Sequence, residues 1–189
     1  MISKKTAIRL LLSAGGAGLM AATVAVASSE AHAGAPGDPV PANLAVPAGQ
    51  TLTANFTGRG VQVYRCTGGA WTFVEPAATL SGRATPSGQA TQAQRHQSAV
   101  HFRGPSWEST TDGSLVEAKA IASSPVPGSI PELLLQATTN RGDGVFGQVS
   151  YVQRLRTSGG AAPAGTCAEG QTTGVPYRAQ YLFFSPTAG

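Results

Sequence analysis

The stretch LTANFTGRGVQVYRCTGGAWTFVE, residues 52–75, contains the clearest indication of the fold class. Apolar and aromatic side chains alternate with polar ones in three runs, at 52–56, 61–66 and 71–75, and glycines stand between the runs. Aromatic and β-branched residues at period two are typical of strands, and glycines between such runs are typical of turns. The stretch therefore predicts three short strands joined by turns at Gly58-Arg59-Gly60 and Thr67-Gly68-Gly69.

The same alternation continues to the end of the chain. It recurs at residues 98–103, 115–122, 130–138, 145–156 and 176–184. Several short strands separated by turn residues predict one all-β domain over residues 50–186, an antiparallel β-sandwich or barrel of about 8–10 strands. Leu133-Leu134-Leu135 leaves a turn of helix open, because periodicity does not assign three consecutive leucines.

The last run has apolar residues on both faces. Tyr177, Tyr181 and Phe183 lie on one face, and Leu182 and Phe184 lie on the other. A strand covered on both faces is typical of the middle of a sheet, so we expect this strand to be central. Two long irregular stretches remain, at 81–97 and 157–174, and we expect them to be loops.

Composition supports a glycine-punctuated β protein. The 189 residues include 24 Gly and 13 Pro, and only 12% are charged, which excludes a coiled coil or a helical bundle. The hydrophobic fraction of 41% is enough for a packed core.

The first 33 residues resemble a secretory signal peptide. Lys4, Lys5 and Arg9 precede an apolar stretch at 10–27, and Ala31-His32-Ala33 follows it. A retained membrane anchor is the alternative, although glycines interrupt the apolar stretch and weaken it as a permanent helix. We expect cleavage after Ala33, a secreted or extracellular protein with no membrane span after cleavage, and a Pro-rich lead-in at 34–49.

Export determines how the two cysteines are interpreted. Cys66 and Cys167 are the only cysteines, and an exported chain meets an oxidising compartment. We therefore predict one disulfide between them, which would close a loop of about 100 residues. The alternative is a pair of free thiols with a catalytic or metal-binding role.

Charge and motifs exclude two kinds of partner. Removal of the leader would leave ten basic and eight acidic side chains, spread along the chain without a cluster of three basic residues. Nucleic-acid binding requires a cationic face, so we expect no nucleic-acid partner. No glycine-rich loop precedes a helix, so we predict no nucleotide cofactor, and indeed no cofactor of any kind.

Histidines and acids offer one candidate for chemistry. His96 and His101, with Glu108 and Asp112, have the types of side chain that bind zinc or act as a general base. His101 lies on the opposite face of its strand from Val100 and Phe102, so a structural, hydrogen-bonded histidine is equally consistent. We assign neither a metal site nor catalytic residues from this pattern.

The motifs together resemble a secreted family known as domain of unknown function 3455. The resemblance covers about residues 40–185 and leaves the activity open, while it implies secretion and the family's fold. Glu132 departs from it, since relatives often have Trp there, and an extra residue stands between Trp107 and Asp112. The matching segments are Gly60–Cys66 with Trp71, His101–Trp107, Asp112–Ser114, Ile130-Pro131, Tyr151–Arg154 with Thr157, Gly159-Gly160, Pro163–Cys167 and Val175–Tyr177.

We expect a binding site along His101–Trp107. A strand that ends at Gly104-Pro105 would leave Trp107 partly exposed at a rim, where its indole could stack on a ligand and Arg103 could donate hydrogen bonds. A buried Trp107 is the alternative. The predicted ligand-contacting residues are His101, Arg103, Trp107 and Asp112.

The expected function is that of a secreted or cell-surface binding or structural module. Its partner would be a carbohydrate, a lipid or a protein at the cell surface. The alternative is an extracellular hydrolase or metal-dependent enzyme that uses His101 with Asp112 or Glu108. A convergence of these three side chains in one pocket would favour the enzyme.

Overall fold

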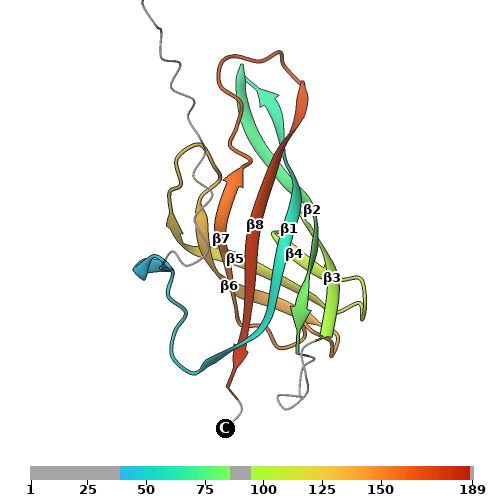
Figure 1. The fold of residues 1–189 in the computed structure, drawn as a ribbon. Coiled ribbons are helices and arrows are strands. Elements are labelled where there is room, and N and C mark those ends of the chain that lie inside the picture. Colours follow the sequence, from blue (N-terminus) through green and yellow to red (C-terminus); the bar gives the residue numbers. More distant parts are fainter. Residues whose placement is uncertain (1–38, 86–94, 188–189) are drawn as a thin grey trace, which may run out of the picture.

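Eight antiparallel strands form one closed barrel, in which each strand pairs with the next and β8 pairs with β1 (Figure 1). The computed structural model describes residues 39–85 and 95–187, so the expected signal peptide lies outside the described residues. The prediction of an antiparallel all-β domain is confirmed, and of the two architectures left open the chain forms the barrel. The strands are β1 (Gln50–Thr67), β2 (Ala70–Ala84), β3 (Arg95–Phe102), β4 (Ser106–Ser109), β5 (Leu115–Ser124), β6 (Glu132–Arg141), β7 (Tyr151–Gly159) and β8 (Thr172–Pro186).

Strand β1 is continuous, so the predicted turn at Gly58-Arg59-Gly60 is wrong. These glycines allow close packing instead. A Cβ atom on Gly58 would lie 2.6 Å from Cε2 of Tyr181, and one on Gly60 would lie 2.1 Å from the carbonyl oxygen of Ala77. The second predicted turn is confirmed, because Gly68 and Gly69 join β1 to β2 with φ angles of 61° and 79°.

Other boundaries also differ from the expectation. The stretch expected as a loop at 81–97 contains the end of β2 and the start of β3, and the stretch at 157–174 contains the end of β7 and the start of β8. Strand β4 was not predicted, because four residues are too few to show a period. The leucines 133–135 belong to a strand, and β8 is central, paired on both sides.

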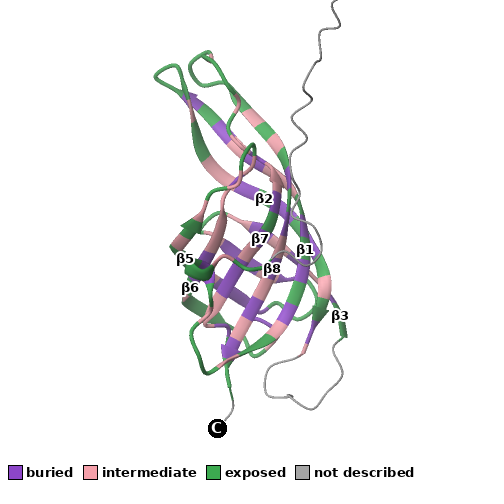
Figure 2. Ribbon diagram, turned by 60° about the vertical axis from the view of Figure 1, so that its left-hand side comes forward, coloured by how far each residue is buried: buried purple, intermediate pink, exposed green. Residues whose placement is uncertain are grey.

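Aromatic rings fill the barrel. The Phe56, Phe146 and Phe183 rings have centroids 4.7–5.9 Å apart, and Trp107 and Tyr181 extend this cluster. Buried positions alternate with exposed ones along the barrel strands, as Figure 2 shows in purple and green. Period-two burial thus places one face of every long strand in a common interior.

Strands β6 and β7 are also covered on their outer face. Leu134 and Leu155 point away from the main cluster and pack with Leu44, which lies in the short 3-10 helix η1 (Ala42–Leu44). Nε2 of Gln153 donates a hydrogen bond to the carbonyl oxygen of Leu44 at 2.7 Å. This part of the expected Pro-rich lead-in therefore packs against the barrel, which explains why three consecutive leucines fit one strand.

The β1–β2 hairpin projects beyond the rest of the barrel, at the top of Figure 1. Cys66 near its tip forms a disulfide with Cys167, with the two Cα atoms 5.8 Å apart, so the predicted pairing is confirmed. The bond joins the hairpin to the segment before β8. Across residues 39–85 and 95–187, no helix has the length and apolar character needed to cross a membrane.

Candidate functional site

A cavity of about 540 Å³ opens where the β1–β2 hairpin leaves the barrel. This volume lies in the range of about 300–1,000 Å³ that is typical of sites for small molecules. Its walls are mainly apolar, and the apolar residues that line it include Phe73, Val74, Ile130, Pro131, Leu133 and Leu135. Phe73 is 51% exposed although it is a large hydrophobic residue, so the apolar surface continues outward from the cavity.

Arg154 is a cation in this apolar cavity. It lies on β7, directly between Leu133 of β6 and Tyr181 of β8 in the sheet register. Its Nε and Nη2 atoms donate hydrogen bonds to the carbonyl oxygen of Pro131 at 3.1 and 2.9 Å. Burial lowers the pKa of Arg154, but a guanidinium group stays protonated in proteins. The cavity therefore has a fixed positive charge.

No carboxylate neutralises that charge. No acidic side chain is among the residues that line the cavity, and the ion pair at its rim joins Arg103, not Arg154, to Glu75. The hydroxyl groups of Tyr177 and Tyr181 are 3.1 Å apart, and burial raises the pKa of both groups, so they stay neutral beside Arg154. A half-buried charge without a counter-charge has a cost for folding, so Arg154 is a candidate for contact with a ligand.

His101 is a neutral histidine on the wall of the cavity. Its Nδ1 atom lies 2.8 Å from the carbonyl oxygen of Ser106, which can only accept, so Nδ1 carries the proton and Nε2 is left as an acceptor. Burial lowers the pKa of His101 to about 3, against the smaller opposing effect of the Ser106 hydrogen bond. The imidazole lies parallel to the Trp107 indole, with ring centroids 4.4 Å apart.

Gln62 contributes an unpaired donor. Its side chain lines the cavity and is 2% exposed, and its Nε2 atom has no hydrogen-bond partner. Buried amide groups are almost always paired, so an unpaired one inside a cavity is consistent with a partner that the chain itself does not supply.

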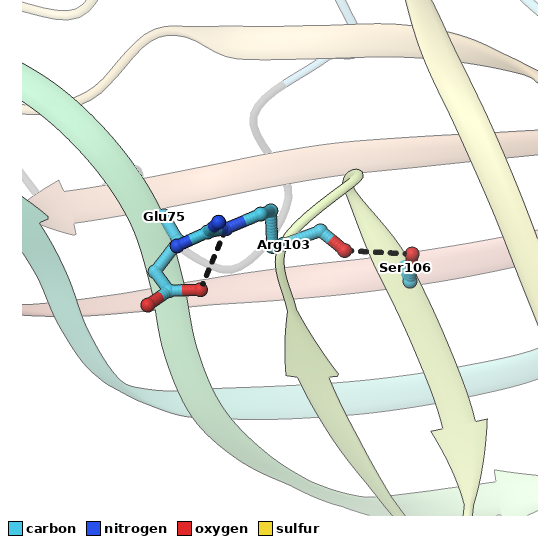
Figure 3. Close-up of polar contacts among 3 residues, drawn as sticks. All are labelled: Glu75, Arg103 and Ser106. Atoms are coloured by element: carbon cyan, nitrogen blue, oxygen red, sulfur yellow. Dashed lines mark hydrogen bonds and ion pairs between the residues drawn. The ribbon is translucent and has the colours of Figure 1, made fainter.

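Two elements meet at the rim of the cavity. Nε of Arg103, in the β3–β4 turn, pairs with Oε2 of Glu75 on β2 at 3.2 Å (Figure 3). The Oγ atom of Ser106 donates a hydrogen bond to the carbonyl oxygen of Arg103 at 2.8 Å, which orients the turn. The Arg103 side chain is 69% exposed, so the pair is solvated and holds the hairpin only weakly.

The four residues predicted to contact a ligand lie in three different settings. His101 and Arg103 line the cavity. Trp107 is 1% exposed, so the expectation of a partly exposed indole at a rim is wrong. Strand β4 turns this side chain inward, where it packs against His101, Tyr181 and Phe183.

Asp112 lies away from the cavity and organises a loop. Its Oδ1 atom accepts hydrogen bonds from N and Oγ of Ser114 at 2.9 and 2.6 Å, and Oδ2 accepts one from N of Val145 at 3.0 Å. Burial alone would raise the pKa of Asp112, but these hydrogen bonds outweigh it and the pKa lies below its usual value. The carboxylate thus accepts hydrogen bonds from two backbone N–H groups and one hydroxyl group of the chain itself, as a structural residue does.

The histidines and acids do not converge. Glu108 lies on β4 opposite Val100, on the face away from the inward Trp107, and His96 is exposed on β3. No group of three His, Cys, Asp or Glu side chains in the described part of the chain is arranged to hold a metal ion. The geometry that would have favoured an enzyme built on His101 with Asp112 or Glu108 is therefore not present.

Sequence reasoning missed Gln62, Arg154 and the tyrosine pair. A signal existed for Arg154, because it stands two residues after Val152 and therefore shares the inward face of the strand with it. The motif Tyr151-Val-Gln153-Arg154 also carried part of the family resemblance. Nothing in the sequence placed Gln62 in the same cavity, because β1 and β7 are joined only through β8.

The chain is thus a closed eight-stranded antiparallel barrel whose mainly apolar cavity contains an arginine with no carboxylate partner among the lining residues. Residues 47–185 match the family model described as "Protein of unknown function (DUF3455)", and the chain belongs to this family. The resemblance drawn from the motifs is thereby confirmed. No curated protein and no solved structure matches the chain.

Proposed function

We propose that this chain is an exported binding protein that takes one small, largely apolar molecule into the cavity beside the β1–β2 hairpin. The observation that carries the proposal is the cavity itself, about 540 Å³ in volume and walled mainly by apolar side chains. Few polar groups among many apolar ones are typical of a site for a small molecule, where the polar groups orient the ligand. Exposed Phe73 extends the apolar surface to the mouth.

Binding suits the groups in the cavity better than catalysis does. A histidine with a pKa of about 3 is a weak base, and the lining residues include no carboxylate that could act as an acid, a base or a nucleophile. The groups present can donate and accept hydrogen bonds without exchanging protons. We therefore favour a carrier or scavenger over an enzyme.

Export is the second part of the proposal. The Cys66–Cys167 disulfide is stable in an oxidising compartment, and the basic and apolar order of residues 1–33 is that of a signal peptide. Production of the full chain in a secreting bacterium tests this. Protein recovered outside the cytoplasm should begin at Gly34, and a chain that stays in the cytoplasm with Met1 intact would contradict export.

Binding is tested with N-phenyl-1-naphthylamine, a neutral fluorescent probe whose emission rises in apolar surroundings. Ala120 lines the cavity and is itself exposed, so Ala120→Trp places a large ring in the site without opening the core. The matched control is Ala77→Trp, at an exposed position of β2 outside the cavity lining. We expect the wild-type chain and the control to bind the probe, and Ala120→Trp to bind it about tenfold more weakly. Equal binding by all three proteins would contradict the proposed site.

A further inference from the structure

We infer that the cavity binds an amphiphilic anion, a carboxylic acid with an apolar body, whose carboxylate contacts Arg154 and Gln62. This inference rests on the proposed function and adds the chemical class of the ligand. The two observations behind it are independent: a cation without a counter-charge and a buried amide without a partner, both on the wall of one cavity.

The guanidinium group has capacity left for a ligand. Both of its hydrogen bonds to Pro131 end on one carbonyl oxygen, and neither uses Nη1. The Tyr181 hydroxyl group is a further hydrogen-bond partner of the guanidinium group, and Tyr177 and His101 also lie near it. All three of these neighbours are neutral, so none of them balances the charge. A carboxylate is the natural partner for the remaining N–H groups, because charge-assisted hydrogen bonds from arginine are shorter and stronger than neutral ones. A ligand cation would be repelled by the same group.

Gln62 adds a second donor of the required kind. Its unpaired Nε2 group can only donate, and a carboxylate can only accept. A carboxylate has two oxygens, so one can face the guanidinium group and the other the amide. A neutral alcohol offers one oxygen and no charge, so it uses less of this donor set.

The remaining residues of the cavity wall are mainly apolar, so they favour a ligand whose non-acidic part is apolar. Leu133 and Leu135 come from β6 and Ile130 from the segment before it, and Phe73 and Val74 come from the hairpin. An alkyl chain or an apolar ring removed from water by these side chains contributes free energy in proportion to the area it buries. The cavity thus combines a polar end and an apolar end, as an amphiphilic monocarboxylate does.

Competition against N-phenyl-1-naphthylamine tests the inference with three probes of one chain length: decanoate, 1-decanol and decyltrimethylammonium. At about pH 7.5 decanoate is ionised. We expect the wild-type chain to bind decanoate about tenfold more tightly than 1-decanol, and decyltrimethylammonium most weakly.

Two variants and one control test which residues cause the preference for decanoate over 1-decanol. Arg154→Gln should reduce the ratio of decanoate to 1-decanol affinity to near one while still binding 1-decanol. Gln62→Leu should weaken decanoate binding severalfold with less effect on 1-decanol. Arg178→Gln removes an exposed arginine of β8 that does not line the cavity, and should leave the ratio unchanged.

The outcomes separate this inference from the proposed function. If the wild-type chain binds the neutral probe and shows no preference for decanoate, the anion inference fails and the proposed function stands. If no probe binds, the proposed function fails as well. A preference that survives Arg154→Gln would overturn the assignment to Arg154. If Arg154→Gln does not fold, the inference is tested by the order of the wild-type affinities for the three probes and by the effect of Gln62→Leu on decanoate binding.

Discussion

His101 shows how burial determines the protonation of a single side chain. Because its pKa falls from 6.5 to about 3 in the folded chain, the unfolded chain binds a proton first as the pH drops. The contribution of His101 to the free energy of unfolding is therefore complete above about pH 6.5 and is lost as the pH falls toward 3. We expect a slope of up to about 1.4 kcal/mol per pH unit from this group between about pH 6 and 4.

Urea unfolding at a series of pH values measures this slope. His101→Gln keeps a donor for the Ser106 carbonyl oxygen but has no titrating proton, so its free energy of unfolding should fall less steeply with decreasing pH. His96→Gln, at an exposed position of the same strand, is the control and should keep the wild-type slope. Parallel curves for the wild-type chain and His101→Gln would contradict a buried neutral imidazole.

Asp112 is a residue whose role is structural. Its carboxylate accepts three hydrogen bonds, two from Ser114 and one from the backbone of Val145. Asp112→Asn replaces one acceptor oxygen by a donor, so we expect the free energy of unfolding to fall by about 1–2 kcal/mol with no change in probe binding. Asp143→Asn, an exposed position in the neighbouring loop, should change it by less than about 0.5 kcal/mol. Loss of probe binding in Asp112→Asn would return this residue to the site.

Strand β1 depends on close packing at Gly58. A Cβ atom there would lie 2.6 Å from Tyr181, which is fully buried and has no room to move. We expect Gly58→Ala to lower the free energy of unfolding by about 1–3 kcal/mol, while Thr57→Ala at the exposed neighbour stays within about 0.5 kcal/mol. Urea unfolding measures both, and equal midpoints would contradict this packing.

The β1–β2 hairpin depends on a covalent bond. Cys66 and Cys167 are 101 residues apart in sequence, and closing a loop of that length is worth about 4–5 kcal/mol in the chain-entropy model. The double variant Cys66→Ser with Cys167→Ser should unfold at a markedly lower temperature. Thiol labelling of the denatured, unreduced wild-type chain should find no free thiol, and full labelling of both cysteines would contradict the bond.

Most of the strands could be predicted from the sequence, but the role of the glycines within β1 could not. Period-two alternation predicted most of the strands and the Gly68-Gly69 turn, because burial on one face repeats with the backbone geometry. It misread Gly58-Arg59-Gly60, because glycine signals a turn and a close contact in the same way. At Gly58 the glycine makes a close contact and not a turn, because the Tyr181 ring packs against it. Tyr181 is more than a hundred residues later in the chain, so the local sequence does not show this contact.

The cavity is formed by residues from several strands across the whole molecule, so it could not be predicted from the sequence. Its polar groups, Gln62, His101 and Arg154, come from β1, β3 and β7 and meet only when the barrel closes. Trp107 shows the same limit, because its inward direction follows from the register between β3 and β4. His101 and Arg103, two of the four predicted ligand contacts, do line the cavity, and both are close in sequence to the strand end at Gly104-Pro105.

A crystal structure of the protein grown with N-phenyl-1-naphthylamine would show whether the barrel takes an apolar ligand into its cavity. We predict electron density for the probe between Phe73 and Leu135, with Phe73 less exposed than the 51% it has without a ligand. Density for the probe only on the outside of the barrel, with the cavity unchanged in a crystal of saturated protein, would contradict this prediction.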